Sequence, residues 1–561
     1  MSRFKWNILP SLPDEQLAGT PDIPPLVRQL LYNRGITEPA DFGPFLDIDE
    51  RLAGDPLLLP DMHQAVGRIY RALLTGENIV VYGDFDCDGI TSTAVLVEGL
   101  RVLGGKVTPY IPHRLTEGYG LKTAALDKLR QDGASLIVTC DCGVTAIPEV
   151  KRAHRAKLDI VITDHHLPLE ELPPAVAVIN PKRRDSHYPY TELAGVGVAY
   201  KLLQALYVSL GREKELENLL DLTAVGTIAD MVPLTGENRL LVKKGLDKLN
   251  SSPRLGIQEI LNQAKVSGEI TPERVSWVLA PRLNTPGRLE HAMASYTLLT
   301  TASPDEAREL TVWLEQKNAE RQRMTSAAQS KAREQVLAGG LTSLLFAADT
   351  EFPIGINGLV ANRLAEEFYR PAFVMRTGEV WSTGSARSIP EFNIIEALKQ
   401  CQGLLSHFGG HTQAAGFTVA NQNLTQLKQA LLEIADTQLR GVELRPHLDI
   451  DAVTTLAELE KNDTYRIIQR LAPFGQGNPM PTFLSRNVTI LECRTMGGNG
   501  DHLRMKLKQN GSVWDAVGFG IGDSIKAITS PADIVYNLEL DRWNGRESLR
   551  LNILDMNGSK N

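Results

Sequence analysis

Short apolar runs that alternate with amphipathic helical stretches restrict the possible fold of this chain more than any other feature of its sequence. The runs NIVVYG, VTPYIP, LIVTC, DIVIT and AVAVIN follow one another from Asn78 onward, and stretches such as ITSTAVLVEGLRVLG and LKTAALDKLRQDG lie between them. Strands that alternate with helices in this way form βαβ units with a mostly parallel sheet. We therefore predict an α/β fold with a parallel sheet in the first half of the chain.

The rest of the 561-residue chain predicts further domains. Residues 303–339 contain no proline after their start and no glycine until their end, which predicts one long helix that connects two domains. We expect a second α/β unit over residues 340–440. Five strand-like runs separated by glycine and asparagine turns over residues 441–561 predict a small β-barrel, with the OB type as the leading candidate. The first α/β domain then spans residues 46–302, after an N-terminal arm at residues 1–45.

Acidic residues and histidines follow three of the predicted parallel strands, and a further acid lies in the apolar helical stretch TIADM. Ligands of parallel α/β sheets bind just beyond the carboxyl ends of the strands, so we expect these side chains to gather at one edge. The residues concerned are Asp84, Asp86, Asp88, Asp141, Asp164, His165, His166 and Asp230.

This group of side chains predicts a metal site. An aspartate at a strand end often only caps the next helix, and that interpretation suits any single member of the group. Carboxylates packed together, however, cost free energy unless cations neutralise them. Oxygen and imidazole ligands suit Mn²⁺ or Mg²⁺, and the histidines favour Mn²⁺. Two such ions can activate water at a phosphoryl centre, so the group predicts a two-metal phosphoesterase.

Other sequence features set limits on the function. The segment from Gly83 to Gly89 is not a P-loop, because five residues separate its glycines and no lysine follows at the required place. Cys140 and Cys142 alternate with Asp141 in a strand and face away from it, so we interpret them as structural. Five cysteines in so long a chain predict a reducing cytoplasm. No apolar run approaches the roughly 20 residues of a membrane span, and we expect no membrane partner.

The motifs GDFDCDG, DCG, TDHH and IADMVPL, in this order, resemble those of the DHH phosphoesterase superfamily. Further motifs narrow the resemblance to the RecJ single-strand-specific exonucleases over nearly the whole chain. These are HRLTEGYG (113–120), PRLNTPGRLE (281–290), STGSARS (382–388), FGGHTQAAGF (408–417) and APFGQGNP (472–479). The resemblance implies a DHH catalytic domain, a DHH-associated domain and an OB-fold. It also implies a processive 5′→3′ exonuclease that releases 5′-mononucleotides from single-stranded DNA in repair and recombination.

The resemblance also implies roles for single residues of the metal site. Metal binding is expected from Asp86, Asp88, Asp141, His165 and Asp230. His166 would face the scissile phosphate, while Asp84 and Asp164 would orient the ligands, a task that metal sites usually require. Tyr82 stands where some relatives have a histidine, so the way in which the first metal completes its shell stays open. Asp451 is a further candidate for a helper acid.

Substrate contacts outside the metal site follow from the same resemblance. A small-residue turn that offers a hydroxyl and a guanidinium suits a phosphate, and we expect Arg114, Ser385 and Arg387 to bind the 5′ phosphate. The glycine loop with Gly409, Gly410 and His411 should meet the substrate near the metals. Arg282 and Asn284 are expected to contact the DNA backbone. OB-folds hold single strands by stacking and a basic groove, and the candidates here are Phe474, Arg504, Lys506, Lys508, Trp514 and Phe519.

The sequence also leads to expectations about the binding partners of the protein and to two alternative functions. The resemblance implies single-stranded DNA as substrate, with a single-strand-binding protein and a helicase as partners, and we expect a monomer. One alternative is a DHH phosphodiesterase that acts on short oligonucleotides or cyclic dinucleotides, although such substrates need no strand-holding barrel. The other is a non-catalytic DNA-binding replication scaffold, which the intact acids and histidines argue against.

The charge of the chain sharpens the expectation for DNA binding. A net charge of −8 points away from nucleic acid, and residues 441–561 carry 14 Lys and Arg against 15 Asp and Glu. Much of the acid, however, lies in the predicted metal site, where bound cations would offset it. We therefore expect a narrow basic path on an acidic body, with binding that is sensitive to salt and poor for duplex DNA.

Overall fold

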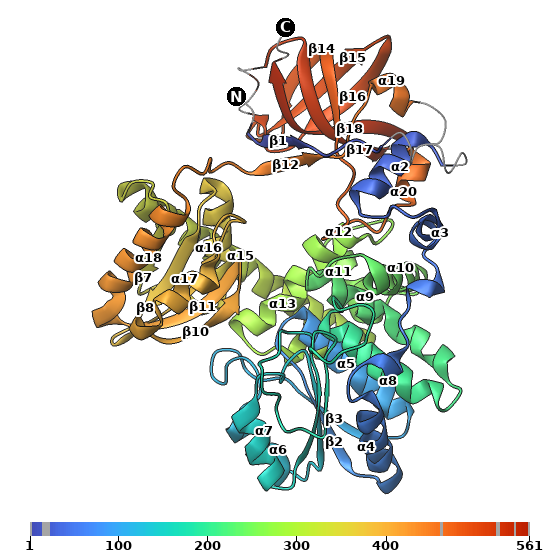
Figure 1. Ribbon diagram of the computed structural model, residues 1–561, viewed down its shortest axis with the longest axis vertical. Coiled ribbons are helices and arrows are strands. Elements are labelled where there is room, and N and C mark those ends of the chain that lie inside the picture. The colour runs from blue at the N-terminus through green and yellow to red at the C-terminus, as the bar shows by residue number, and fades with distance from the viewer. Residues whose placement is uncertain are drawn as a thin grey trace. The chain divides into compact units, whose positions relative to one another are not determined.

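Figure 1 shows the computed structural model of the chain, which describes residues 3–13, 23–460, 464–522, 525, 528–543 and 546–558. These residues form two compact units. The α/β unit contains Pro56–Asp230 and Gly245–Leu444, and the barrel unit contains the described residues up to Asp55, Met231–Lys244 and those from Arg445 onward. Among the described residues, no helix is both long and apolar enough to cross a membrane.

A five-stranded parallel sheet forms the base of the α/β unit. Its strands, in the order β3-β2-β4-β5-β6, are β3 (Lys106–Tyr110), β2 (Asn78–Tyr82), β4 (Leu136–Cys140), β5 (Asp159–Thr163) and β6 (Ala177–Ile179). The chain starts at β2, moves to β3 and then returns past β2 to β4. The strand order therefore reverses between β2 and β4, and this is the point at which doubly wound sheets bind their ligands.

Helices cover both faces of this sheet. On one face, α6 (Thr123–Gln131) and α7 (Ile147–Arg155) lie together and share an apolar core with β2, β4 and β5 (Figure 1). On the other face, α5 (Cys87–Val102) packs against α8 (Gly195–Val208) and α9 (Leu220–Ala229). Because both faces are covered, β4 is buried at every position, which explains its continuous apolar sequence.

The second sheet of the α/β unit has the order β10-β11-β9-β8-β7, with only β7 and β8 parallel. Helices α17 and α18 pack on one of its faces, and α15 and α16 pack on the other. The bounds of these elements are β7 (Leu345–Asp349), β8 (Ala372–Thr377), β9 (Trp381–Arg387), β10 (Leu405–His411), β11 (Ala414–Ala420), α16 (Asn357–Phe368), α17 (Ile394–Gln400) and α18 (Leu424–Gln438).

A helix of 35 residues, α15 (Pro304–Ala338), connects the regions of the two sheets. The Ser303 side chain caps it by accepting a hydrogen bond from the Glu306 amide. Its first part contacts α11, α13 and α14, and its last part contacts α16 and β7. The α/β unit also contains α4 (Met62–Thr75), α11 (Leu255–Gln263), α12 (Pro272–Arg274), α13 (Ala280–Leu289) and α14 (Met293–Thr300), whereas α10 (Gly236–Ser251) begins in the barrel unit and ends in the α/β unit.

The barrel unit is built from five strands in the order β14-β15-β16-β18-β17, and pairing of β14 with β17 closes the barrel. The N-terminal strand β1 pairs in parallel with β12, so the N-terminal arm belongs to this unit. The strands are β1 (Lys5–Ile8), β12 (His447–Ile450), β13 (Ala452–Val453), β14 (Phe483–Met496), β15 (His502–Gln509), β16 (Ser512–Gly518), β17 (Ala532–Trp543) and β18 (Arg546–Gly558). The helices are α2 (Pro25–Asn33), α3 (Pro39–Asp47), α19 (Leu456–Leu459) and α20 (Thr464–Gln469).

The predicted fold class is confirmed by this architecture. The chain contains a parallel-sheet domain, a second α/β domain and a C-terminal closed barrel of five strands.

Candidate active site

The loop between β2 and α5 provides the first group of carboxylates. Asp86 is the N-cap of α5, and its Oδ1 accepts hydrogen bonds from the amides of Asp88 and Gly89, each at 3.1 Å. The two oxygens of Asp88 accept the amides of Gly195 at 2.7 Å and Val196 at 2.8 Å, at the start of α8. Backbone amides therefore hold both carboxylates in fixed orientations at two helix N-termini.

Asp141 follows β4, on the other side of the point where the strand order reverses. Its backbone has a left-handed conformation, with φ of +61°, which a non-glycine residue rarely adopts. A Cβ on Gly195 would lie 2.7 Å from the Asp141 Cβ and 2.8 Å from its Oδ1. The carboxylate of Asp141 therefore occupies space that only a glycine at position 195 leaves open.

Asp164 orders the two histidines that follow β5. Its Oδ1 accepts the amides of His165 at 2.7 Å and His166 at 3.1 Å, and lies 2.8 Å from His166 Nδ1. Burial alone would raise the pKa of Asp164, but the hydrogen bond from His166 and its charge hold that pKa at about 2. Burial opposes the charged form of His166, but Asp164 and other nearby acids raise the His166 pKa to about 9. The pair is therefore a carboxylate and an imidazolium at neutral pH.

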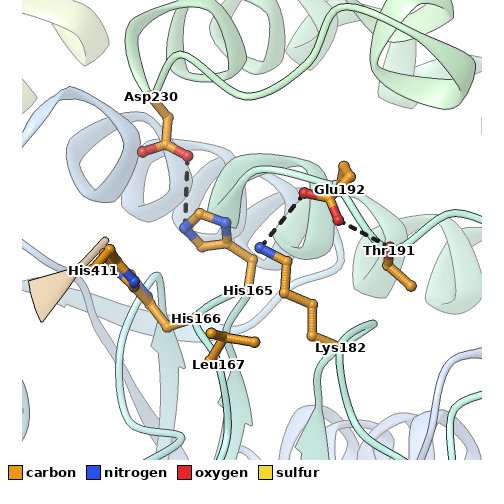
Figure 2. A pocket seen from close by; sticks show the side chains of 8 residues that line it. All are labelled: His165, His166, Leu167, Lys182, Thr191, Glu192, Asp230 and His411. Atoms are coloured by element: carbon orange, nitrogen blue, oxygen red, sulfur yellow. Dashed lines mark hydrogen bonds and ion pairs between the residues drawn. The ribbon is translucent and has the colours of Figure 1, made fainter. Parts of the chain in front are cut away.

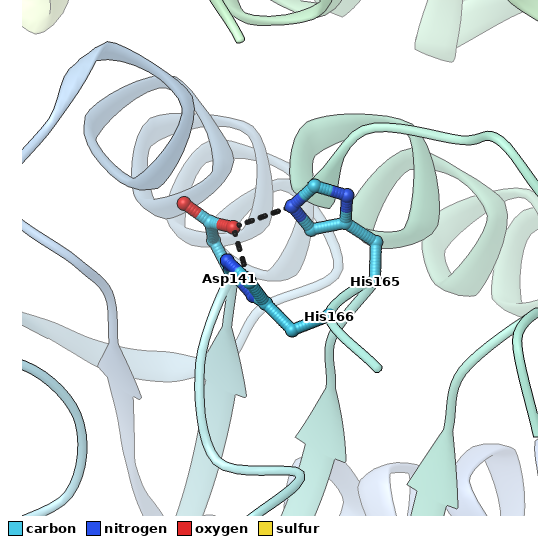
Figure 3. A group of neighbouring side chains, drawn as sticks. All are labelled: Asp141, His165 and His166. Carbon is cyan, nitrogen blue, oxygen red and sulfur yellow. Dashed lines mark ion pairs between the residues drawn. The ribbon is translucent and has the colours of Figure 1, made fainter. Parts of the chain in front are cut away.

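His165 lies among three carboxylates, of which Figure 2 shows Asp230 and Figure 3 shows Asp141. Its Nε2 is 3.1 Å from Asp141 Oδ1, 3.6 Å from Asp230 Oδ2 and 3.9 Å from Asp88 Oδ2. Burial, together with the charge of His166, lowers the pKa of His165 to about 3, so its imidazole is neutral. Neutral imidazole is the form that binds metal ions.

Several buried atoms at this place lack the hydrogen bonds that buried polar groups normally make. Within the described part of the chain, no hydrogen-bond partner is found for Asp84 Oδ1, Asp141 Oδ1 or either ring nitrogen of His165. Asp141 Oδ1 and His165 Nε2 are only 3.1 Å apart, yet they are not placed to form a hydrogen bond. Unpartnered lone pairs that converge in this way fit a metal ion between them.

The charges of the site also fit divalent cations. Burial and mutual repulsion raise the pKa of Asp88 to about 7, and raise those of Asp84, Asp141 and Asp230 well above the ordinary value. Ligand atoms lie within 4.8 Å of one another in three sets, which are Asp84–Asp86–Asp141, Asp88–His165–Asp230 and Asp141–His165–His166. All five predicted ligands belong to these sets, and Asp84, predicted to orient them, does as well.

Tyr82 does not turn toward the metal site. Its side chain is fully buried in the core beneath α6 and α7, and its hydroxyl donates a hydrogen bond to the Gly120 carbonyl at 3.2 Å. The place of the histidine found in some relatives is therefore filled by a residue that supports the loop after β3.

An arginine cluster flanks the Asp84 and Asp86 side of the site. It consists of Arg114, Arg288, Arg321 and Arg387, and none of the four makes an ion pair with another described residue. Burial, with the added charges of Arg114 and Arg321, lowers the pKa of Arg288 to about 9. All four are partly buried, and desolvated cations without carboxylate partners are costly unless an anion binds to them.

The sequence predicted two members of this cluster and missed the other two. The Arg114 guanidinium lies over the Phe85 ring, 4.9 Å from its centroid, and the pKa of Arg114 is lowered by burial. Arg387, on β9, is close enough to Gly358 that a Cβ there would lie 3.2 Å from its guanidinium. Ser385, also predicted, lies near the same glycine. Arg288 belongs to the motif PRLNTPGRLE, which could have identified it as a candidate. Arg321 belongs to none of the motifs, so the sequence does not single it out.

Arg282 and Asn284 are engaged within the protein. Arg282 forms a bidentate ion pair with Glu315, in which Nε lies 2.6 Å from Oε2 and Nη2 lies 3.2 Å from Oε1. Asn284 Oδ1 accepts the Cys87 amide at 2.7 Å and so helps to fix the start of α5 beside Asp86 and Asp88. Contact of these two residues with DNA remains a prediction, but both side chains already make interactions within the protein.

A cavity of about 590 Å³ opens onto the predicted metal ligands (Figure 2). His165, His166 and Asp230 line it, together with His411 at the end of β10. The rings of His166 and His411 are stacked, with centroids 6.1 Å apart and planes at 14°. Gly410 has φ of +146°, and a Cβ there would lie 2.2 Å from the Ala414 carbonyl oxygen. The predicted glycine loop is therefore the paired end of strand β10, and Gly410 allows the close strand contact that places His411 beside the predicted metal site.

The predicted DNA contacts in the barrel unit differ in exposure. Arg504, Lys506 and Lys508 are exposed on one face of β15, since the strand alternates between buried and exposed positions. Phe519 is 48% exposed, whereas Trp514 is 6% exposed and belongs to the barrel core. Trp514 therefore offers little surface for stacking.

Two other predicted residues of the barrel unit have structural contacts. Phe474 packs against the barrel core. Asp451 is held by the Thr482 amide at 3.0 Å and by Arg34 at 3.4 Å, and it lies in none of the metal-binding sets.

Comparisons with known proteins give three matching family models. These are the DHH family, N-terminal domain (residues 78–227), the DHHA1 domain (342–440) and the RecJ OB domain (450–555). A single-stranded-DNA-specific exonuclease RecJ of Bacillus subtilis (strain 168) is 39% identical over 564 residues, covering 99% of this chain and 71% of that protein. RecJ from Thermus thermophilus in complex with Mn²⁺ has a TM-score of 0.86 at 29% identity, covering 100% of this chain and 80% of that one. The same protein with Mg²⁺ has a TM-score of 0.78 at 28% identity, covering 100% and 79%.

Gly195→Ala is expected to weaken Mn²⁺ binding by about tenfold or more, because the new methyl group must displace the Asp141 carboxylate. Gly197→Ala is the matched control, since it adds the same methyl group to the same helix but meets only the Leu193 side chain, at 3.3 Å. Calorimetric titration of both variants with Mn²⁺ measures the difference. Equal affinities for the two variants would show that Gly195 does not position Asp141.

Mn²⁺ binding is expected to release protons and to strengthen between about pH 6 and pH 8. A protonated carboxyl cannot bind the ion, and the raised pKa of Asp88, about 7, keeps it partly protonated below neutrality. His165, with a pKa of about 3, adds no proton in this range. Titrations in two buffers with different heats of ionisation count the released protons. An affinity that does not change with pH, with no proton release, would contradict the raised pKa values.

Proposed function

The chain belongs to the RecJ family of single-stranded-DNA-specific exonucleases, and we propose that it hydrolyses single-stranded DNA from the 5′ end, releasing 5′-mononucleotides in repair and recombination. The observation that carries this proposal is the metal-binding group at the edge of the parallel sheet with an unpaired arginine cluster on one flank. Cation sites beside an anion site suit a phosphodiester next to a terminal phosphate.

Two divalent ions, Mn²⁺ or Mg²⁺, are proposed as cofactors. The sets Asp84–Asp86–Asp141 and Asp88–His165–Asp230 would hold them, and Asp141 of the first set lies 3.1 Å from His165 of the second. Bound there, such ions would supply positive charge to the phosphodiester and activate water for its attack. The unpartnered atoms of Asp84, Asp141 and His165 support this assignment.

His166 is proposed to stabilise charge on the reacting phosphate. Its raised pKa keeps the ring protonated at neutral pH, and Asp164 engages Nδ1 at 2.8 Å. The Nε2 proton is then available to a phosphate oxygen or to the leaving 3′ oxygen of the terminal nucleotide. Because the Asp164 carboxylate also accepts two backbone amides, the ring is oriented before the substrate arrives.

The arginine cluster is proposed to bind the 5′ phosphate. A terminal phosphate carries more negative charge than an internal phosphodiester, so it compensates several cations at once. Arg114 lies close enough to Asp84 and Asp86 for their charges to interact, which places the cluster beside one end of the metal-binding group. This arrangement favours cleavage at the first internucleotide bond.

The barrel unit is proposed to hold the strand. The exposed basic residues Arg504, Lys506 and Lys508 on β15 form a narrow stripe, and Phe519 can stack on a base. A strand-holding barrel favours long substrates over short oligonucleotides or cyclic dinucleotides.

The remaining assignments follow from the family. We propose a DHH domain at 46–302, a connecting helix at 303–339, a DHH-associated domain at 340–440 and an OB domain at 441–561. We also propose a cytoplasmic monomer that works with a single-strand-binding protein and a helicase.

Labelled mononucleotide should be released at once from 5′-labelled single-stranded DNA, and only at the end of digestion from 3′-labelled DNA. Asp141→Ala is expected to reduce the rate by about 1,000-fold or more, because it removes a carboxylate that belongs to one proposed ion site and lies 3.1 Å from His165 of the other. Asp132→Ala, an exposed acid at the end of α6, is the control and should keep full activity. Early release of the 3′ label would refute the polarity, and activity in Asp141→Ala would refute the site.

A 5′-phosphorylated strand should be cleaved faster than the same strand with a 5′ hydroxyl, and Arg387→Ala should abolish this preference. We expect a loss of about 10- to 100-fold on the phosphorylated strand, as for removal of a charged hydrogen bond. Arg376→Ala, exposed on the neighbouring strand β8, is the matched control. If Arg387→Ala slows both substrates equally, the 5′ phosphate is bound elsewhere.

A further inference from the structure

The cavity at the metal-binding group extends past the ligands to side chains that the proposed function has not used. Leu167, Lys182, Thr191 and Glu192 complete its lining, as Figure 2 shows. Leu167 directly follows His166, Lys182 follows β6, and the other two precede α8. These four side chains offer an apolar surface, a cation, a hydroxyl and a carboxylate next to the reaction site.

Among the residues that the structure describes, the ammonium group of Lys182 has only a long-range ion pair with Glu192. Its Nζ lies 3.8 Å from Glu192 Oε2, which is too long for a hydrogen bond, and its side chain is 22% exposed. Glu192 also accepts a hydrogen bond from the Thr191 hydroxyl at 3.0 Å. The charge of Lys182 acts on His165, Asp230 and His411, so the ammonium group faces the cavity side of the metal ligands.

The metal-binding group therefore has cations on two different flanks. The arginine cluster interacts with Asp84 and Asp86, whereas Lys182 interacts with His165 and Asp230. Asp141 lies between these two sets of ligands. A strand with its 5′ phosphate on the arginine flank and its first internucleotide phosphate at the ligands can continue into the cavity on the Lys182 flank.

We propose that Leu167, Lys182 and Thr191 form the subsite for the first nucleotide of the retained strand, and that Lys182 binds the phosphodiester on its 3′ side. This inference rests on the proposed function. Leu167, which is 64% exposed, supplies apolar surface for the sugar or base. Lys182 exchanges its long contact with Glu192 for a direct contact with the phosphate, so the ammonium has a negative partner both with and without DNA. Glu192 is the partner of Lys182 between substrates.

The test is the single-turnover release of the first nucleotide from a 5′-phosphorylated, 5′-labelled DNA decamer in Mn²⁺. A neutral methylphosphonate at the second internucleotide linkage should slow the wild-type protein by about 10- to 100-fold. Lys182→Met, which keeps most of the apolar stem, should lose a similar factor on the unmodified strand. It should lose nothing further on the modified strand, because the same contact is already absent. If the two losses multiply, Lys182 does not bind this phosphate.

Two controls separate the subsite from general effects. Arg184→Ala removes a cation from the same loop, but Arg184 is exposed and pairs only with Glu170, at 3.4 Å, among the residues that the structure describes. This variant should keep both its activity and its full sensitivity to the methylphosphonate. Lys182→Met should show the same Mn²⁺-induced rise in melting temperature as the wild type, which confirms its fold and metal binding.

The outcomes distinguish this inference from the proposed function. If the wild-type protein releases no nucleotide from the unmodified strand, the exonuclease proposal itself fails. If it releases the first nucleotide equally fast from the modified and unmodified strands, only the subsite is refuted. That second result needs no variant, so a folding defect in Lys182→Met cannot obscure it.

Discussion

Repulsion between buried carboxylates is the constraint on which the rest of the α/β unit depends. Asp84, Asp88, Asp141 and Asp230 share one small volume, and burial and mutual repulsion raise the pKa of each of them. No nearby lysine or arginine forms an ion pair with these four acids among the described residues. The fold therefore holds these groups in an arrangement that becomes favourable when cations bind.

The backbone, and not charge pairing, keeps this arrangement in place. Amides at the starts of α5 and α8 hold Asp86 and Asp88, and Asp141 keeps a left-handed backbone beside a glycine. Such preorganisation leaves the carboxylate lone pairs free for ions. Cations without close carboxylate partners among the described residues lie on either side of the group, and the proposed direction of the strand depends on phosphates binding to both.

Much of this site could be predicted from the sequence, because continuous apolar strands and acids at their ends are local signals whose meaning the parallel sheet fixes. The arginines show where such reasoning stops. Arg282 and Arg288 lie in one motif and look equivalent, yet Arg282 pairs with Glu315, while Arg288 is partly buried without an ion pair to any described residue. Trp514 similarly looked like a stacking residue, but the alternation of β16 turns it into the barrel core. The ion-pair partner of an arginine and the face to which a strand side chain points depend on packing between segments that are distant in the sequence.

The acid and histidine group is proposed to bind two divalent ions. Crystals of the protein soaked in Mn²⁺ and measured at the manganese absorption edge would test it most directly, because anomalous scattering locates each ion. Two peaks are expected, one among Asp84, Asp86 and Asp141 and one among Asp88, His165 and Asp230. A single peak, or peaks outside these two sets of ligands, would contradict it.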